Sequence, residues 1–498
     1  MNIQEQEQGK LISIPSDNTF KAVMYSLASI TTVFVIIIFG VLIYFSVNNI
    51  ITQRRNQPLP EDDPSYFLGY DPNLFVTRKS GKLQATYLTN CLEGKEPSCY
   101  FQNPTTPYCS INFLYPIIPN YNNLSINASI AISTFTLIPN ELVILYGEGI
   151  PDFTYWGFTP YLVSDEEYCN GELLLASIAD TANNINTQFT KNKKFVIIFG
   201  TNTQLITQFK SSIDPSFEVY LVQFPSFSEK GRLLIVGRTA IPVNQEEADA
   251  FYRDTKIYGS IIQYYKEVNP SYTVTSPTFI PRNSFFNEHT EGPTDTVFEA
   301  ESDLYLTQVL QTIPSDYQYV HELEVDLFLS SINYDNGYDC IENCVLCQID
   351  NRDTVYTYSI VPYLITPNQD IVVIFGVNHS IQGKSLYTNV SVYNYDNDSG
   401  LVSEEFLSTD SQFYNFIISP NPITVPENTD TYILPPNVDK IIVGERAYIQ
   451  TIGPNGKDNS GISSSYDTLI KPRVWVISTI PNPPTYEITK TNHINMYL

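Results

Sequence analysis

Histidine, tryptophan, methionine and basic residues are all scarce in this chain of 498 residues. It has four histidines, two tryptophans and three methionines, and only 27 lysines and arginines against 53 aspartates and glutamates. The net charge of −26 repels phosphate backbones, which excludes nucleic-acid binding. The low histidine count leaves few side chains for acid–base catalysis. The 36 tyrosines and 28 phenylalanines nevertheless provide enough apolar surface for a folded core.

The motifs of common hydrolases and cofactor sites are also missing. There is no G-x-S-x-G, and the second histidine of H-E-x-x-H does not follow His321. His379, after an apolar strand, could serve as a base, although a loop histidine is the simpler interpretation. The carboxylates Asp165 and Glu167 could serve a glycosidase, as could many such pairs. We therefore predict no catalytic, cofactor-binding or metal-binding residue.

Residues 22–53 carry no charged side chain. Their most apolar part, residues 25–44, would span about 30 Å as a helix, which is the thickness of a bilayer core. Tyr25 and Tyr44 stand where interfacial aromatic residues are favoured. No small-residue cleavage site of a signal peptide follows the run. We predict an uncleaved signal anchor, a transmembrane helix over residues 22–47 after a tail of residues 1–21.

Cysteines and glycosylation sequons indicate the orientation of that segment. All seven cysteines and five N-x-S sequons follow it, and residues 1–21 contain neither. Disulfides form in oxidising compartments, so we predict a cytosolic N-terminus and a lumenal or extracellular C-terminal part. The lipid bilayer is then a partner of the N-terminal helix. The candidate glycosylation sites are Asn123, Asn127, Asn378, Asn389 and Asn397.

Prolines and polar residues divide the rest of the chain. Residues 57–64 are proline-rich and acidic, which is typical of an extended stalk. A second break, residues 270–296, is rich in proline, asparagine and glutamate. We predict a stalk over residues 48–82, a first half over residues 83–270, a linker over residues 271–296 and a second half over residues 297–498.

The first half alternates apolar runs with helix signals. Asn244 can cap a helix, with Glu247 bonding back to its amide. Helices are also predicted over residues 180–189, 203–212 and 257–267. Strands are predicted over residues 142–147, 173–178, 195–200, 219–224 and 233–237.

The second half shows mostly strand patterns. Turn residues at Asp335-Asn-Gly and Asp398-Ser-Gly favour antiparallel pairing. The predicted fold class is therefore α+β, with a single N-terminal transmembrane helix, a mixed α/β first half and a β-rich antiparallel second half. Strands are predicted over residues 319–328, 355–364, 371–375, 386–393, 413–418, 440–443 and 473–477.

Two short sequence patterns recur in the same order in both halves. Phe195-VIIFGTN is echoed by Ile371-VVIFGVN, and Ile235-VGRTAI is echoed by Ile442-VGERAYI. A duplicated domain would explain both echoes. The simpler interpretation is that apolar strands often end in glycine.

The cysteines are disulfide candidates: Cys91, Cys99, Cys109, Cys169, Cys340, Cys344 and Cys347. By proximity, Cys91 could pair with Cys99 or Cys109, and one of these three with Cys169. The cluster Cys340-x3-Cys344-x2-Cys347 could bind zinc only with a fourth ligand, such as His321, and disulfides are the better interpretation in an oxidising compartment. An odd count leaves one thiol free, buried or joined to another chain.

The aromatic stretch Asp152-FTYWGFTPYL is the most unusual local feature. Packing within a core strand is its simplest interpretation. A stacking platform for a sugar or a hot spot for a protein partner is the functional alternative.

Abundant asparagine, isoleucine and tyrosine, short acidic turns and an N-terminal anchor characterise the whole chain. In these features it resembles uncharacterised single-pass membrane proteins of giant DNA viruses that infect amoebae, the mimivirus group, although lysine is scarcer here. The resemblance implies a membrane or virion setting. We expect a type II membrane glycoprotein that acts as a binding or structural surface component for a protein or glycan ligand. The alternative is a membrane-anchored hydrolase of glycans or esters, with His379 or a carboxylate pair in a deep cleft.

Overall fold

The structure is a computed structural model in which the described residues lie within one compact unit, Glu61–Leu498. It describes residues 64–86, 108–113, 133–265, 293–327, 336–347, 353–365, 369–448 and 469–481, with short gaps at 226, 229, 254, 360–362, 382 and 397–398. Of these residues, 46% are in strands and 18% in helices. The chain is therefore mainly β in both of its parts, residues 64–265 and residues 293–481.

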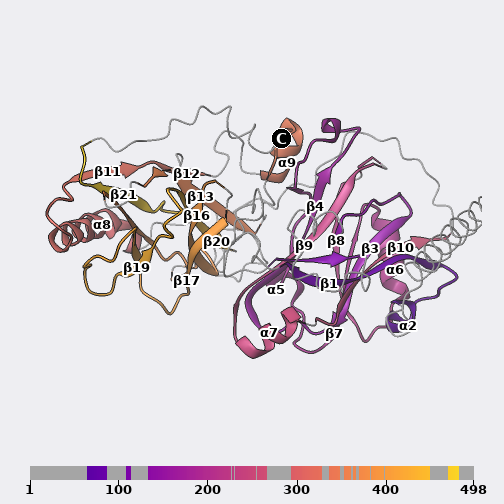
Figure 1. Ribbon diagram of the computed structural model, residues 1–498. Helices are drawn as coiled ribbons and strands as arrows, with labels where there is room; N and C mark the ends of the chain where they lie inside the picture. Colours follow the sequence, from indigo (N-terminus) through magenta and orange to yellow (C-terminus); the bar gives the residue numbers. More distant parts are fainter. Residues whose placement is uncertain are drawn as a thin grey trace, which may run out of the picture. The chain divides into compact units, whose positions relative to one another are not determined.

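The first part forms a ten-stranded sheet, called sheet A here (Figure 1). The strand order is β5-β4-β9-β2-β1-β10-β3-β7-β8, and β6 also pairs with β4. The described neighbours are antiparallel except β7 and β8, which run parallel. The strands are β1 (Phe75–Thr86), β2 (Tyr108–Asn112), β3 (Glu141–Glu148), β4 (Phe153–Ser164), β5 (Ala176–Ser177), β6 (Ala182–Asn183), β7 (Lys194–Gly200), β8 (Glu218–Gln223), β9 (Arg232–Pro242) and β10 (Ile257–Tyr264).

Short helices accompany sheet A. The α6 helix connects β7 to β8, because parallel strands need a crossover, and its Leu205 and Phe209 pack on Ile144 and Val196 of the sheet. A second core lies on the opposite face of these strands and includes Phe251 of α7. The helical segments are α2 (Pro64–Leu68), η2 (Cys169–Gly171), α5 (Asn184–Thr187), α6 (Thr203–Ser212) and α7 (Gln245–Arg253).

The second part is a sandwich of two sheets. Sheet B has the order β11-β21-β15-β18-β19, and sheet C has the order β12-β13-β20-β16-β17 with β14 beside β20. Val372 and Ile374 of sheet B pack against Val390 and Val443 of sheet C, which fills the sandwich interior. The strands are β11 (Tyr319–Leu323), β12 (Val325–Leu327), β13 (Thr354–Ser359), β14 (Tyr363–Leu364), β15 (Asp370–Val377), β16 (Tyr387–Asn394), β17 (Ser399–Phe406), β18 (Phe413–Ser419), β19 (Asp430–Ile433), β20 (Lys440–Tyr448) and β21 (Arg473–Ser478).

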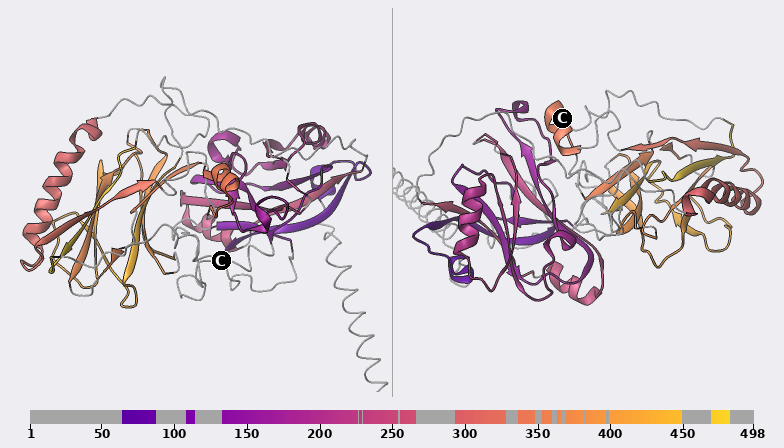
Figure 2. Two further views of the ribbon diagram at one scale, coloured as in Figure 1. Left: turned by 90° about the horizontal axis from the view of Figure 1, so that it is seen from above. Right: turned by 180° about the vertical axis from the view of Figure 1, so that it is seen from behind.

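Two helices belong to the second part of the sequence. The α8 helix (Pro293–Thr312) covers the outer face of sheet B (Figure 2). Its Tyr305 and Val309 pack with Phe375 and Trp475 of the sheet. The α9 helix (Asn336–Asn343) packs instead against β5 of sheet A. The α8 helix was not predicted, because its apolar residues are spread around the helix and form no amphipathic stripe.

The prediction of an α+β first half is wrong. Residues 257–267, predicted as a helix, contain β10, which pairs with β1 on one side and β3 on the other. The spacing of its apolar residues fits a helix, but β-branched isoleucines and pairing on both edges favour a central strand. The helices predicted near residues 203–212 and after Asn244 exist as α6 and α7, yet they only flank a large antiparallel sheet.

The transmembrane helix in the predicted fold class gains no support from the structure. No helix in the part of the chain that the structure describes is long and apolar enough to cross a membrane. The segment 22–47 and the tail 1–21 lie outside the described residues, as does most of the linker predicted over residues 271–296. Residues 75–82, which were predicted to be stalk, belong to β1 inside sheet A.

Candidate functional site

Arg238 of β9 is a buried cation surrounded by tyrosines. Alternation along the strand places it on the same face as Leu234 and Val236, and it is 1% exposed. Its Nη1 donates a hydrogen bond of 2.7 Å to Tyr161 Oη. The guanidinium carbon lies 4.7 Å from the ring centre of Tyr108 and 5.5 Å from that of Tyr161. These distances are those of cation–π contacts.

Arg446 of β20 is the corresponding cation of the second part. It is 2% exposed and points away from the sandwich interior, because its neighbour Glu445 points inward. Its guanidinium carbon lies 5.4 Å from the ring centre of Tyr356 and 5.5 Å from that of Tyr393. A buried arginine stays charged at any ordinary pH, so aromatic faces are its natural packing partners.

Tyrosine stacking joins the surroundings of the two arginines. The ring of Tyr155, from β4, lies 5.1 Å from Tyr448 and 6.3 Å from Tyr387, and the last two rings stack at 4.4 Å. Asp353 accepts hydrogen bonds of 3.0 Å from Tyr155 Oη and Asn183 Nδ2. We call the following residues the arginine–tyrosine cluster: Arg238, Arg446, Tyr108, Tyr155, Tyr161, Tyr356, Tyr358, Tyr387, Tyr393 and Tyr448.

The electrostatics of the cluster follow from its two cations. Burial raises the pKa of Tyr108, but Arg238 and Arg446 together outweigh burial and leave that pKa below its usual value. Burial raises the pKa of Tyr387 and Tyr393 well above the ordinary value of 10.0. The cluster is thus a positively charged, desolvated centre in an acidic protein. Its groups are buried, and their contacts go to strands of both parts of the chain.

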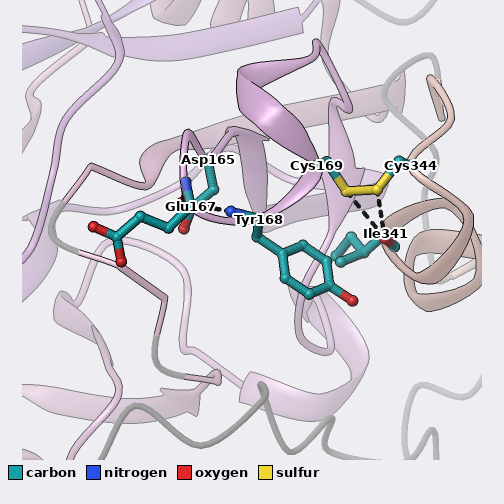
Figure 3. Close-up of a disulfide and its surroundings, with 6 residues drawn as sticks. All are labelled: Asp165, Glu167, Tyr168, Cys169, Ile341 and Cys344. Atoms are coloured by element: carbon teal, nitrogen blue, oxygen red, sulfur yellow. Dashed lines mark hydrogen bonds between the residues drawn. A yellow bond between two sulfur atoms is a disulfide. The ribbon is translucent and has the colours of Figure 1, made fainter.

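A disulfide also joins the two parts of the chain. Cys169, in η2, is bonded to Cys344, which follows α9, across a sequence separation of 175 (Figure 3). A second bridge, Cys340–Cys347, closes α9 and its following turn. The prediction that the cysteines near residue 340 form disulfides is confirmed. The predicted pairing of Cys169 with Cys91, Cys99 or Cys109 is wrong, because chain proximity does not reveal a long-range partner.

Among the described cysteines, Cys109 on β2 is free and buried. Burial raises the pKa of its thiol to about 12, so it is an unreactive thiol. Cys91 and Cys99 lie outside the described residues. Within the described residues no group of three or more histidine, cysteine or acidic side chains could hold a metal ion.

The histidines do not form a solvent-facing site in the described structure. His379 follows β15 and is 0% exposed; its Nε2 lies 3.1 Å from the carbonyl of Ile470 and 3.7 Å from Glu445 Oε1. His321 lies on β11, and His289 and His493 lie outside the described residues. The hydrolase alternative predicted His379 in a deep cleft, whereas the structure encloses it.

Asp165, of the carboxylate pair considered for a glycosidase, has a structural role. Asp165 is 1% exposed and accepts backbone hydrogen bonds from Glu167 and Tyr168 (Figure 3). It also accepts one from the backbone N–H of Ser228. The hydroxyl of Ser228 donates a further hydrogen bond of 2.6 Å. A carboxylate with this many donors closes a turn and has little capacity left for a substrate.

Two of the predicted glycosylation sites are enclosed. Asn378 is 1% exposed, and its Nδ2 donates to the carbonyls of Leu407 and Ser411. Asn389 is 0% exposed, and its Nδ2 donates 2.6 Å to Ser403 Oγ. A glycan needs that same nitrogen exposed to solvent, so the fold as it stands leaves no room for one. The other three sites, Asn123, Asn127 and Asn397, lie outside the described residues.

The aromatic stretch after Asp152 forms β4, so packing within a core strand is confirmed. Trp156 faces the core of sheet A, while Tyr155 and Tyr161 belong to the arginine–tyrosine cluster. The two arginines were not predicted as site residues. A signal for them was present, since Arg238 and Arg446 both occur in the repeated I-V-G pattern.

Comparisons with known proteins find similarity only among solved structures. No family model matches it, and no curated protein matches it. Among solved structures it is similar to a putative uncharacterized protein from Burkholderia cenocepacia, with 10% identity and a TM-score of 0.38 over 80% of this chain and 82% of that one. It is also similar to the VPA0106 protein from Vibrio parahaemolyticus, with 12% identity and a TM-score of 0.37 over 78% and 94% of the two chains.

Proposed function

We propose that this chain is a binding or structural component of a lumenal or extracellular compartment, with its β-sheets serving as a disulfide-locked scaffold. The observation that carries the proposal is the bridge between Cys169 and Cys344, residues 175 positions apart. Such a bridge forms and persists where thiols are oxidised. The arginine–tyrosine cluster supports the same role, because it ties strands of the first part to strands of the second.

A scaffold explains where the chemically capable groups lie. Catalysis needs an acid, base or nucleophile within reach of a substrate. His379, Glu445, Arg238 and Arg446 are instead all at most 2% exposed. Their hydrogen bonds and ring contacts go to neighbouring strands. The ligand class that fits is a protein or glycan, and the net charge of −26 favours a ligand with basic groups.

The proposal is tested by mapping the disulfides of the protein in the cells that produce it. Cells are lysed directly into a denaturant with N-ethylmaleimide, and the protein is digested without reduction. We expect a peptide pair joined through Cys169 and Cys344. Cys109, the free thiol, should carry the label and so controls for the labelling itself. Recovery of Cys169 and Cys344 as two labelled thiols, with no bridged peptide, would refute the proposal.

The compartment is tested separately by protease protection. Sealed vesicles with their cytosolic face outward are prepared from cells that express the full chain, and they are treated with protease with or without detergent. We expect the fragment from residue 64 onward to resist digestion until detergent is added. Digestion without detergent would place this part on the cytosolic face and contradict the proposal.

A further inference from the structure

The α9 helix and the turn after it cover one edge of sheet A. Cys340, Ile341 and Cys347 are all 0% exposed and belong to the core that includes Leu174 and Ala176. The backbone N–H of Cys347 donates 2.6 Å to the carbonyl of Leu174. Because β5 is the last strand of the sheet at this end, α9 and residues 344–347 occupy a position where an exposed strand edge would otherwise lie.

The two disulfides near α9 have different roles and different exposure. We call α9 and residues 344–347 the cover. The Cys340–Cys347 bridge lies within the cover, and both of its cysteines are fully buried. Cys169–Cys344 attaches the cover to the first part of the chain, and Cys344 is only partly buried. Cys344 is therefore the cysteine of the two bridges that a reductant in solution reaches most easily.

The backbone on both sides of the attaching bridge is held in the left-handed region. Cys169 has φ 56°, its neighbour Asn170 has φ 54° and Cys344 has φ 52°. Residues with a Cβ rarely adopt such angles, because the Cβ crowds the backbone. Breaking the bridge removes one constraint on these backbone angles, and forming it again restores that constraint. Strained and exposed disulfides are the labile ones.

We propose that α9 is a cover held by a reducible latch, and that the latch is the Cys169–Cys344 disulfide. A dithiol reductant attacks Cys344 Sγ as a thiolate and forms a mixed disulfide. Cys169 leaves as a thiolate and takes up a proton. The second thiol of the reductant then displaces Cys344 and completes the reductant's own disulfide, so two electrons pass to the protein.

Release of the cover exposes the β5 edge of sheet A to solvent. Leu174 loses the hydrogen bond from Cys347, and the apolar contacts of Ile341 with the core open to solvent. The cover itself stays intact, because Cys340–Cys347 still closes it. This switch goes beyond the proposed function and does not depend on which ligand the protein binds. It acts when the protein passes from an oxidising to a reducing environment.

The order of reduction tests the latch. The purified full chain is equilibrated with increasing dithiothreitol, quenched with acidic N-ethylmaleimide and mapped by mass spectrometry. We expect Cys169 and Cys344 to be half labelled at a reductant concentration about tenfold lower than Cys340 and Cys347. Equal sensitivity of the two bridges, or earlier reduction of Cys340–Cys347, would overturn the proposal.

Hydrogen exchange tests the cover. After selective reduction, the peptides with residues 173–178 and 340–347 should exchange at least about tenfold faster, because local opening now exposes their amides. Peptides from β15 in sheet B should not change and serve as the internal control. A Cys169→Ser/Cys344→Ser variant should show the fast exchange without reductant. If the amides of both peptides stay protected once the bridge is shown to be broken, the cover does not open and the proposal fails.

Discussion

Glu445 tests how burial inside the sandwich changes the pKa of a carboxyl group. Its carboxyl is 2% exposed between sheets B and C, and Tyr414 Oη donates 2.7 Å to Oε1. Thr357 Oγ1 lies 3.5 Å from Oε2, and His379 Nε2 lies 3.7 Å from Oε1. Burial raises the pKa of Glu445 to about 8, because it disfavours the charged form more than the hydrogen bonds from Tyr414 and Thr357 favour it.

The raised pKa predicts the direction of a stability change with pH. An unfolded glutamate titrates near its ordinary pKa of 4.5, whereas the folded protein keeps the proton up to about 8. Between these values the folded state binds more protons than the unfolded state. The free energy of unfolding therefore falls as pH rises through this window. At about 1.4 kcal/mol per pKa unit the whole shift corresponds to roughly 5 kcal/mol. This is an upper limit, because the buried site can relax around the charge, so we expect about 2–4 kcal/mol.

The perturbation is Glu445→Gln, which keeps an oxygen for Tyr414 and removes the titration. Urea unfolding of both proteins is followed between pH 5 and pH 8. Trp475 is 1% exposed in β21 and reports on the sandwich, and a Trp156→Phe background removes the other tryptophan. The wild type should lose about 2–4 kcal/mol more than the glutamine variant on going from pH 5 to pH 8. Other acidic groups contribute equally to both proteins, so the difference isolates Glu445. Identical pH dependence of the two proteins would refute the reasoning.

Two further predictions concern the second part of the chain. Asn378 and Asn389 should carry no glycan in the folded protein, because their side-chain amides are buried and hydrogen-bonded. Peptide mass spectrometry after enzymatic deglycosylation in heavy-oxygen water checks this. An oxygen-18 label at either site would contradict the prediction. Arg446→Ala should lower the free energy of unfolding by about 2–4 kcal/mol, because it removes two aromatic contacts and leaves a cavity between strands. Urea unfolding measures this change. The control is Arg253→Ala at an exposed position, which should change the free energy of unfolding by less than about 0.5 kcal/mol. Equal effects of the two substitutions would argue against a stabilising role of the cluster.

The strands of the second part could be predicted from the sequence because alternation and turn residues are local signals. Residues 371–375 and 473–477 lie within β15 and β21, and β16 and β17, the strands on either side of the sequence turn signal at residues 398–400, pair antiparallel. The cap at Asn244 was also predictable, since its Oδ1 accepts the backbone N–H groups of Glu246 and Glu247. Such features depend on residues a few positions apart.

The arrangement of sheet A could not be read from the sequence for the opposite reason. β10 takes its place between β1 and β3, whose residues come from distant parts of the chain. Asp335-Asn-Gly has the composition of a hairpin turn, yet α9 begins within it at Asn336. The partner of Cys169 likewise depends on where α9 packs. Long-range pairing decides each of these outcomes, and local propensity is a weak guide to it.

Glu445 and Arg446 are both buried ionisable residues of one strand, and the fold accommodates them in two different ways. They are neighbours in β20, and alternation sends Glu445 into the sandwich and Arg446 into the arginine–tyrosine cluster. A carboxyl can lose its charge by binding a proton, so its burial becomes dependent on pH. A guanidinium cannot lose its charge, so it is packed against ring faces, which attract a cation at any pH. Raising the pH should therefore loosen the sandwich around Glu445 while the contacts of Arg446 with Tyr356 and Tyr393 persist. It follows that alkaline unfolding should begin inside the sandwich, with the cluster as the later step.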